Sequence, residues 1–150
     1  MGDAMQDWLS MTAADLGRGI GTGAIDPVAL TQTYLDAIQA HPHKTKIYSA
    51  VTADRAMAEA AAAKERAAAK LRLGPLDGVP ISWKDLFDSA GTATEAGSAL
   101  LKGRVPTRDA TVLRTATMAG LVCLGKTHMS ELAFSGLGLN PITETPPCVN

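Results

Sequence analysis

Residues 74–91 read G-P-L-D-G-V-P-I-S-W-K-D-L-F-D-S-A-G, and the rest of the chain is best understood from this stretch outward. Glycine and proline at its start predict a turn. Residues 79–84 then alternate between apolar and polar side chains closely enough to predict a short strand. Because successive side chains on a strand point to opposite faces, we expect Trp83 to be buried and Lys84 to face either solvent or a pocket. A lysine beside an aspartate at a strand end is ordinarily a solvated surface residue, since unpaired lysines are seldom buried.

Capping residues mark two helix starts nearer the N-terminus. Thr12 and Asp15 have the spacing of an acidic capping box, which predicts a short helix that ends in the glycine-rich residues 18–23. An aspartate directly before a proline predicts a second helix over residues 27–40, because proline is favoured at the first helical position. The histidines and lysines of residues 41–46 then predict a basic, solvated loop.

Strands and helices alternate through the rest of the chain. In order, we predict a strand over residues 47–51, an alanine-rich helix over 53–71, a helix from 107 or 108 to 118, a buried strand over 121–124 and a short helix over 130–134. Alternation of this kind predicts an α/β fold, in which helices pack on a sheet. Only 4% of the residues are aromatic, so the core should consist mainly of aliphatic side chains.

The composition argues against several classes of partner. With 14 basic and 15 acidic residues, the formal net charge is −1, which gives no long-range attraction to nucleic acid or to an anionic membrane. No stretch reaches the roughly 18 apolar residues of a membrane-spanning helix. Cys123 and Cys148 are too few for a disulfide framework or a metal cluster. We therefore expect a cytoplasmic protein with no metal, no cofactor and no membrane contact.

Two formal motif matches are weak in their context. Residues 120–127 fit the pattern of a phosphate-binding P-loop, but a predicted helix stands before Gly120 where that loop needs a strand. Residues 19–24 fit the dinucleotide-binding fingerprint, but they also follow a helix. We therefore predict a strand in the first place and a turn in the second, with no nucleotide site in either.

Five short motifs follow one another along the chain. They are Gly74–Asp85, Ala96–Ser98, Arg108–Thr111, Gly125–Ala133 and Ser135–Asn140. Their sequences and their order resemble those of the amidase signature family of serine amidases, whose consensus begins G-P-L-x-G-x-P-x-x-x-K-D. The resemblance starts near Thr12 and covers only the N-terminal portion of that family's domain.

The resemblance implies a fold. We expect the α/β, N-terminal part of the amidase-signature fold, a mixed sheet flanked by helices that is incomplete in this chain. Residues 1–150 would form the N-terminal portion of a single amidase domain. Within it, a helical N-terminus would occupy about residues 1–45 and a lysine-bearing α/β part about residues 46–150.

The resemblance also implies roles for individual residues. Members of the family hydrolyse amides through an acyl-enzyme, using a nucleophilic serine, a second serine on a cis peptide bond and a lysine base (a Ser-cisSer-Lys triad). The lysine corresponds to Lys84, which would have to be neutral and therefore shielded from water. Asp85 would support it through hydrogen bonds at the strand end. Met129 and Phe134 resemble positions near the substrate pocket, although an apolar residue at helical spacing is more often part of the core.

The sequence departs from the family pattern in two places. Both family serines lie in a G-G-S-S-type stretch that follows a T-P turn, and this sequence stops at T-P-P-C-V-N. Neither Ser98 nor Ser135 matches a serine position of the family, so the chain alone is expected to be inactive. His128 stands where the family usually has asparagine.

Two classes of function remain open. The favoured one is a part of an amidase that acts on a small-molecule amide, either as a homodimer or as the A-type subunit of a tRNA-dependent amidotransferase with its partner subunits. The alternative is a non-enzymatic α/β binding module, or a pseudo-enzyme, that keeps the lysine segment for packing.

Overall fold

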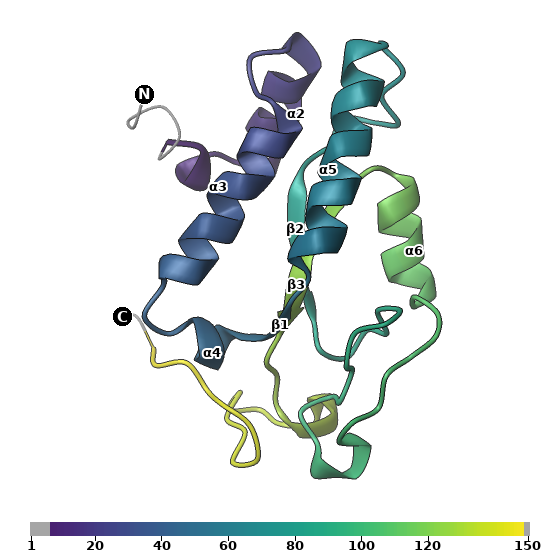
Figure 1. Ribbon diagram of the computed structural model, residues 1–150. Coiled ribbons are helices and arrows are strands. Elements are labelled where there is room, and N and C mark those ends of the chain that lie inside the picture. Colours follow the sequence, from purple (N-terminus) through teal and green to yellow (C-terminus); the bar gives the residue numbers. More distant parts are fainter. Residues whose placement is uncertain (1–6, 149–150) are drawn as a thin grey trace.

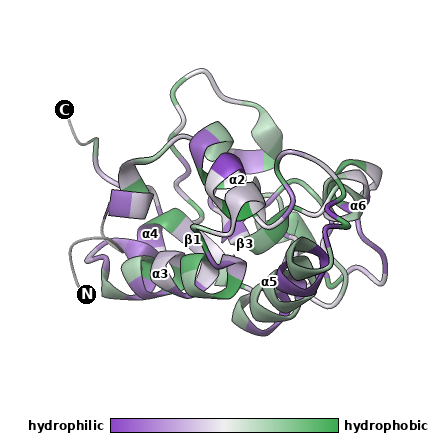
Figure 2. Ribbon diagram, turned by 90° about the horizontal axis from the view of Figure 1, so that it is seen from above, coloured by the Kyte–Doolittle hydropathy of each residue, from purple (hydrophilic) through white to green (hydrophobic). Residues whose placement is uncertain are grey.

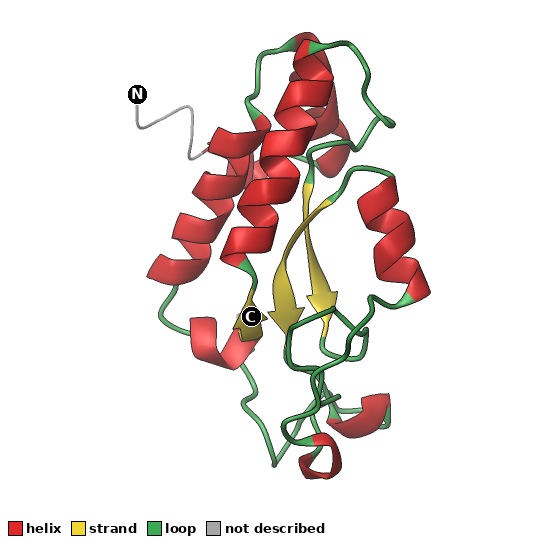
Figure 3. Ribbon diagram, turned by 45° about the vertical axis from the view of Figure 1, so that its right-hand side comes forward, coloured by secondary structure: helices red, strands yellow, loops and turns green. Residues whose placement is uncertain are grey.

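The sheet has three strands in the computed structural model, which describes residues 7–148. Their bounds are β1 (Tyr48–Val51), β2 (Pro80–Lys84) and β3 (Val122–Thr127). Strand β3 lies in the middle, antiparallel to β1 and parallel to β2 (Figure 1; Figure 3). The predicted α/β class and mixed, open sheet are confirmed, and β3 continues past the predicted end of its strand.

Helices cover both sides of this sheet. In chain order they are α2 (Ala13–Thr22), α3 (Pro27–Ala40), α4 (Lys44–Ile47), α5 (Ala53–Ala68) and α6 (Thr111–Met118), with the 3-10 turns η1 (Trp8–Ser10), η2 (Ala99–Leu101) and η3 (Glu131–Ala133). Helices α3 and α5 lie on one side of the strands and α6 lies on the other (Figure 1). Among the described residues, no helix is both long and apolar enough to cross a membrane.

Each side of the sheet has its own core. Toward α3 and α5, Val122 and Leu124 of β3 pack against Leu35. Toward α6, Trp83 of β2 packs against Leu113, which confirms the predicted burial of the tryptophan. Figure 2 shows hydrophobic and hydrophilic residues mixed along α3 and α5, as expected of helices that bury one side. Because fully burying one such side chain stabilises the fold by about 1.5–3 kcal/mol, these contacts fix the strands between the helices.

Both predicted helix caps are confirmed. The Thr12 hydroxyl accepts a hydrogen bond from the N–H of Asp15 at 3.1 Å, and α2 begins directly after Thr12. The Asp26 carboxylate accepts the N–H of Val28 at 2.8 Å, and α3 begins at the residue after Asp26, as predicted. A capping side chain of this kind stabilises its helix by about 1 kcal/mol.

The first helix ends within the predicted residues 18–23, but most of this glycine-rich stretch is helix and not the predicted turn. Helix α2 continues through the glycines to Thr22, and Gly23 follows with a φ of +78°, which suits a left-handed C-cap. Packing explains the difference, because Gly17 lies against the backbone of Pro75 and a Cβ at that position would overlap the Pro75 carbonyl oxygen. Close contact with the turn at residues 74–78 offsets the low helix propensity of glycine.

Other boundaries differ by less. The predicted basic loop at residues 41–46 contains part of the short helix α4, and α5 ends at Ala68, before its predicted end. Helix α6 begins at Thr111, later than predicted, since the N–H of Ala110 donates to the carbonyl of Asp88 at 2.9 Å and holds the preceding segment out of the helix.

Neither nucleotide-binding pattern forms a phosphate loop. Residues 120–127 are the strand β3 and the two residues before it, which follow α6. Residues 19–24 lie at the end of α2 and in the turn that follows it. The predicted strand is confirmed for residues 122–124, whereas the predicted turn at residues 19–24 was wrong for residues 19–22, which are helical.

The register of the sheet aligns the ends of its strands. Thr127 of β3 lies opposite Tyr48 of β1 and opposite Lys84 of β2. The register shifts once on each side of β3. Gly125 adjoins the shift with β2, and on the other side of β3 a Cβ at Gly125 would overlap the carbonyl oxygen of Ala50 in β1. Such irregularities re-aim the side chains around them, which here are those at the end of the sheet.

Candidate active site

The candidate active site lies where the parallel strands β2 and β3 end. Their last residues, Lys84 and Thr127, are partners in the register. Each strand is followed by a segment that is mostly loop, residues 85–98 after β2 and residues 128–140 after β3. Parallel strands deliver such loops to the same edge of the sheet, which is where ligands bind in open α/β sheets.

The backbone around Lys84 is held by hydrogen bonds on both sides. Its carbonyl oxygen accepts from the N–H of Phe87 at 3.1 Å, and the N–H of Asp85 donates to the Thr127 carbonyl at 2.9 Å. The Thr127 hydroxyl donates to the carbonyl of Trp83 at 3.3 Å. The side chain of Lys84 is exposed. The expectation that this lysine is shielded from water is therefore not met by the described part of the chain.

A buried ion pair lies directly beside Lys84. The Nζ atom of Lys126, on β3, is 3.0 Å from Oδ1 of Asp85 and 2.7 Å from Oγ1 of Thr94. Lys126 is completely buried, and Asp85 is only 4% exposed. Because water does not reach either charge, each must be stabilised by the other and by the hydrogen bonds around them. The site thus contains two lysines in opposite environments, one exposed and one enclosed.

Lys126 is a site residue that the sequence motifs did not single out. In the sequence it lies in the P-loop pattern at residues 120–127 and in the motif Gly125–Ala133, but neither pattern assigned it a role. The available signal was its place directly after the apolar residues of a strand predicted to be buried on both faces. A lysine in such a strand needs an acidic partner, since unpaired lysines are rarely buried. Asp85, at the end of the neighbouring strand, is that partner.

Unusual backbone conformations are concentrated next to this ion pair. Ala96 (φ +49°), Leu132 (φ +48°) and Ala133 (φ +60°) adopt the left-handed region, which residues other than glycine seldom occupy. The carbonyl of Ala96 accepts the N–H of Leu132 at 2.9 Å, so the strained parts of the two loops are in contact. Residues in such conformations gather at catalytic and ligand-binding sites.

Hydrogen bonds join the loops that follow the two strands. The side-chain amide of Asn140 donates to the carbonyls of Gly97 and Met129, both at 2.8 Å. The hydroxyl of Ser98 donates to a carboxylate oxygen of Glu131 at 2.8 Å. Three of the five sequence motifs are therefore brought together into one hydrogen-bonded unit at the end of the sheet.

The Arg108–Thr111 motif makes its contacts away from the ion pair of Asp85 and Lys126. Asp109 accepts two hydrogen bonds from the guanidinium of Arg55, at 3.0 and 2.8 Å, and one from the N–H of Ala90 at 2.8 Å. The hydrogen bonds from Arg55 hold the pKa of the Asp109 carboxyl below its usual range, so Asp109 is charged at neutral pH. This ion pair fastens the segment between β2 and α6 to α5.

The two residues expected near a substrate pocket lie in different environments. Met129 is only 6% exposed, and its carbonyl accepts the hydrogen bond from Asn140. Phe134 is 94% exposed. The structure buries one and leaves the other on the surface, so the assignment of this pair to a substrate pocket stays a prediction.

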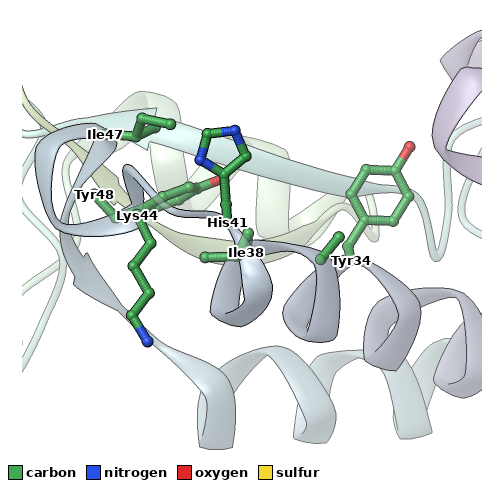
Figure 4. Close-up of a pocket in the computed structure, with 7 residues that line it drawn as sticks. Tyr34, Ile38, His41, Lys44, Ile47 and Tyr48 are labelled. Carbon is green, nitrogen blue, oxygen red and sulfur yellow. The ribbon is translucent and has the colours of Figure 1, made fainter. Parts of the chain in front are cut away.

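A separate apolar pocket of about 190 Å³ lies between α3, α4 and β1 (Figure 4). It is lined by Tyr34, Ala37, Ile38, His41, Lys44, Ile47 and Tyr48. The hydroxyl of Tyr48 is 2.6 Å from that of Ser82, on β2. Lys84 does not line this pocket, which is therefore distinct from the candidate active site. Within residues 7–148, no group of three His, Cys, Asp or Glu side chains is arranged to hold a metal ion.

Comparison with known sequences finds similarity to amidases and to amidotransferase subunits. A family model described as Amidase matches residues 29–148. The chain is 38% identical over 130 residues to the A-type subunit of the glutamyl-tRNA(Gln) amidotransferase of Streptomyces coelicolor, covering 87% of this chain and 26% of that protein. It is 42% identical over 136 residues to the corresponding protein of Anaeromyxobacter dehalogenans, covering 91% of this chain and 27% of that protein. The chain spans about a quarter of the length of these curated relatives.

Solved structures agree with the sequence comparison. The peptide amidase of Stenotrophomonas maltophilia matches with a TM-score of 0.73 and 36% identity, over 81% of this chain and 25% of that one. A fatty acid amide hydrolase matches with a TM-score of 0.84, over 97% of this chain and 26% of that one. Its identity of 17% makes it evidence for the fold alone.

Proposed function

This chain belongs to the amidase family, and on that premise we propose that it supplies the lysine base of an amide-cleaving enzyme. The observation that carries the proposal is the place of Lys84. Its exposed side chain stands at the carboxyl end of β2, on a backbone fixed by hydrogen bonds at Lys84 and Asp85. It also lies within the motif Gly74–Asp85, in which the family resemblance assigns the base to this lysine.

In the proposed reaction, Lys84 starts a proton relay. A bridging serine gives its hydroxyl proton to the neutral amine of Lys84 and takes the proton of a nucleophilic serine, whose oxygen attacks the amide carbonyl. Backbone N–H groups stabilise the resulting oxyanion. The relay then returns a proton to the departing amine, and water releases the acid from the acyl-enzyme. Both serines would come from outside these 150 residues.

Two serines in the family motifs of this chain, Ser98 and Ser135, are consistent with that assignment. Ser98 is 3% exposed, and its hydroxyl already donates to Glu131. Ser135 is exposed, and its hydroxyl accepts the N–H of Leu137 at 3.1 Å. A nucleophilic serine of the proposed relay needs a hydrogen-bonded connection to Lys84, and in the described part of the chain neither hydroxyl is bonded to that lysine.

Lys84 can act as a base only when it is neutral, and removal from water favours the neutral amine. Because its side chain is exposed here, the rest of the enzyme would have to cover it. Leu132 and Phe134, on the loop after β3, present exposed apolar surface against which a covering segment could pack. The enclosed form of the site would thus be completed by further residues of the amidase domain.

Transfer of the amide nitrogen is a second candidate for the reaction. It is favoured by the names of the two curated relatives described above, each of which belongs to an amidotransferase. In that case a small-molecule amide would donate its nitrogen to an acceptor in place of water, and the enzyme would work with partner subunits. A non-enzymatic α/β module, or a pseudo-enzyme, is the remaining alternative.

An assay of ammonia release separates these candidates. The chain, extended to the length of its relatives, would be incubated with a panel of primary amides that includes glutamine, asparagine and peptide amides. We expect ammonia from at least one amide, with acid as the second product for a hydrolase. Ammonia release only when an acceptor and partner proteins are added would identify a transferase. Release of no ammonia under either condition would leave the non-enzymatic module.

A further inference from the structure

We propose that Lys126 is a positioning residue for Lys84, acting through the buried carboxylate of Asp85; this proposal rests on the proposed function of Lys84 as a base. The two lysines lie near the ends of neighbouring strands but cannot exchange roles. Lys126 is enclosed completely and is paired with Asp85, whereas Lys84 is exposed. An enclosed, ion-paired ammonium has no access to a substrate, so the contribution of Lys126 must pass through the residues that it touches.

The ammonium of Lys126 spans two segments of the chain. It donates to Oδ1 of Asp85 at 3.0 Å and to Oγ1 of Thr94 at 2.7 Å. Asp85 directly follows β2, and Thr94 lies farther along the loop between β2 and η2. Both partners are buried, with 4% and 1% of their surfaces exposed. One charge therefore holds the start and the middle of this loop together in the interior.

Asp85 passes this restraint to Lys84. Its second carboxylate oxygen accepts the N–H of Glu95 at 3.2 Å, and its carbonyl accepts the N–H of Ala96 at 3.2 Å. Its own N–H donates to the carbonyl of Thr127 at 2.9 Å. With its carboxylate and both of its backbone polar groups bonded, Asp85 has no freedom to rotate. The peptide that it shares with Lys84 is consequently fixed, and with it the direction in which the base leaves the sheet.

The restraint extends to the strained part of the site. Ala96 is bonded to Asp85 through its N–H and to Leu132 through its carbonyl. Ala96 and Leu132 have φ angles of +49° and +48°, conformations that persist only where surrounding contacts impose them. Loss of the Lys126 charge would leave the Asp85 carboxylate unpaired in the interior, so we expect it to turn toward water and release these contacts.

Enzyme kinetics on the chain extended to the length of its relatives test this proposal. The variant Lys126→Met keeps the length of the side chain and removes the ammonium. We expect kcat to fall by about 10- to 100-fold with little change in KM, because a misplaced base slows the chemical step without loosening the substrate. The double variant Asp85→Asn/Lys126→Met should be no worse than Lys126→Met alone, since both changes break the same connection.

Three further variants make the result decisive. Lys64→Met, in the exposed ion pair with Asp26, is the matched control and should leave kcat unchanged. Thr94→Val removes one acceptor of the ammonium while keeping the shape of the side chain, and it serves if Lys126→Met does not fold. We expect Thr94→Val to lower kcat by about threefold or more, again at constant KM. Lys84→Ala reports on the proposed function separately.

Each outcome has one meaning. If Lys84→Ala abolishes activity while folded Lys126→Met and Thr94→Val keep the parent kcat, the positioning role is overturned and the base assignment stands. If Lys84→Ala keeps activity, the proposed function fails and this inference fails with it. If kcat falls only in proportion to the fraction of folded protein, measured by circular dichroism, Lys126 is structural and the positioning role is rejected.

Discussion

The side chains of Asp85 and Lys126 form a buried ion pair, with 3.0 Å between Oδ1 and Nζ. The aspartate follows strand β2, and the lysine is in the parallel strand β3. Lys84, the residue before Asp85, is exposed. Two adjacent residues therefore lie in opposite environments, since the carboxylate of Asp85 is enclosed and the side chain of Lys84 is exposed. This arrangement fixes the backbone at the point where the family resemblance places a catalytic base.

Removing one partner of this ion pair should lower the stability of the fold. In Lys126→Met the Asp85 carboxylate would remain buried without its partner, and we expect the free energy of unfolding to fall by about 3–5 kcal/mol. The double variant Asp85→Asn/Lys126→Met should lose less, because no charge is left unpaired. Urea denaturation followed by circular dichroism measures both. A double variant that is less stable than Lys126→Met would contradict this account.

Acid should weaken the fold through Asp109. Its pKa in the folded chain is lowered, chiefly by the hydrogen bond from Arg55, so the ion pair stabilises the fold fully above the unfolded value of about 3.9. That stabilisation is lost as the pH falls through the lower pKa that Asp109 has in the folded chain. Asp109→Asn should therefore reduce the free energy of unfolding at about pH 7, and by less once the pH is below the unfolded pKa of about 3.9. Urea denaturation at the two pH values gives the difference, and equal losses would count against the pairing.

A methyl group at Gly125 should disturb the sheet. The new Cβ of Gly125→Ala would overlap the carbonyl oxygen of Ala50 in β1, and we expect a loss of about 1–3 kcal/mol from the strain. Gly136→Ala is the matched control, because nothing lies within 4 Å of a Cβ at that position. Thermal melts should show a lower Tm for the first variant only. The same Tm for both would mean that β1 and β3 approach less closely.

The chain as described should associate through its exposed apolar side chains. Leu100, Phe134 and Leu137 are 83%, 94% and 82% exposed, and large apolar side chains this exposed favour contacts with other protein. Sedimentation velocity should show a mass that rises with concentration. Phe134→Ser combined with Leu137→Ser should reduce this association, whereas Leu71→Ser, in the segment after α5, should not. A parent chain that stays monomeric at all concentrations would contradict the prediction.

Local signals in the sequence predicted most of the elements. The caps at Thr12 and Asp26 and the alternation over residues 79–84 depend only on neighbouring residues, and all three were confirmed. The helical conformation of residues 18–22 was not predicted, because α2 is held by contacts between residues far apart in the chain, such as that between Gly17 and Pro75. Contacts of that kind override local propensity and leave no mark in a short window of sequence.

Local sequence signals also predicted part of the candidate site, but not the contacts between residues far apart in the chain. The motif around Lys84 placed it at a strand end, and the structure puts it in the last position of β2. The pairing of Asp85 with Lys126 depends on the register of β2 and β3, which shifts near Gly125, and a sequence pattern does not encode that register. The sequence left open whether Lys84 faces solvent or a pocket, because cover for a side chain comes from residues elsewhere in the fold.

The role of Lys84 as the base is tested by replacing this lysine in the extended chain and measuring kcat. Lys84→Ala should lower kcat by at least about a thousandfold, because members of a catalytic unit fail together. Lys84→Arg should be no better, since a guanidinium does not give up its proton and so cannot accept one. Both variants should keep the circular dichroism spectrum of the parent. If both retain kcat within about threefold of the parent, Lys84 is a surface lysine and the account is wrong.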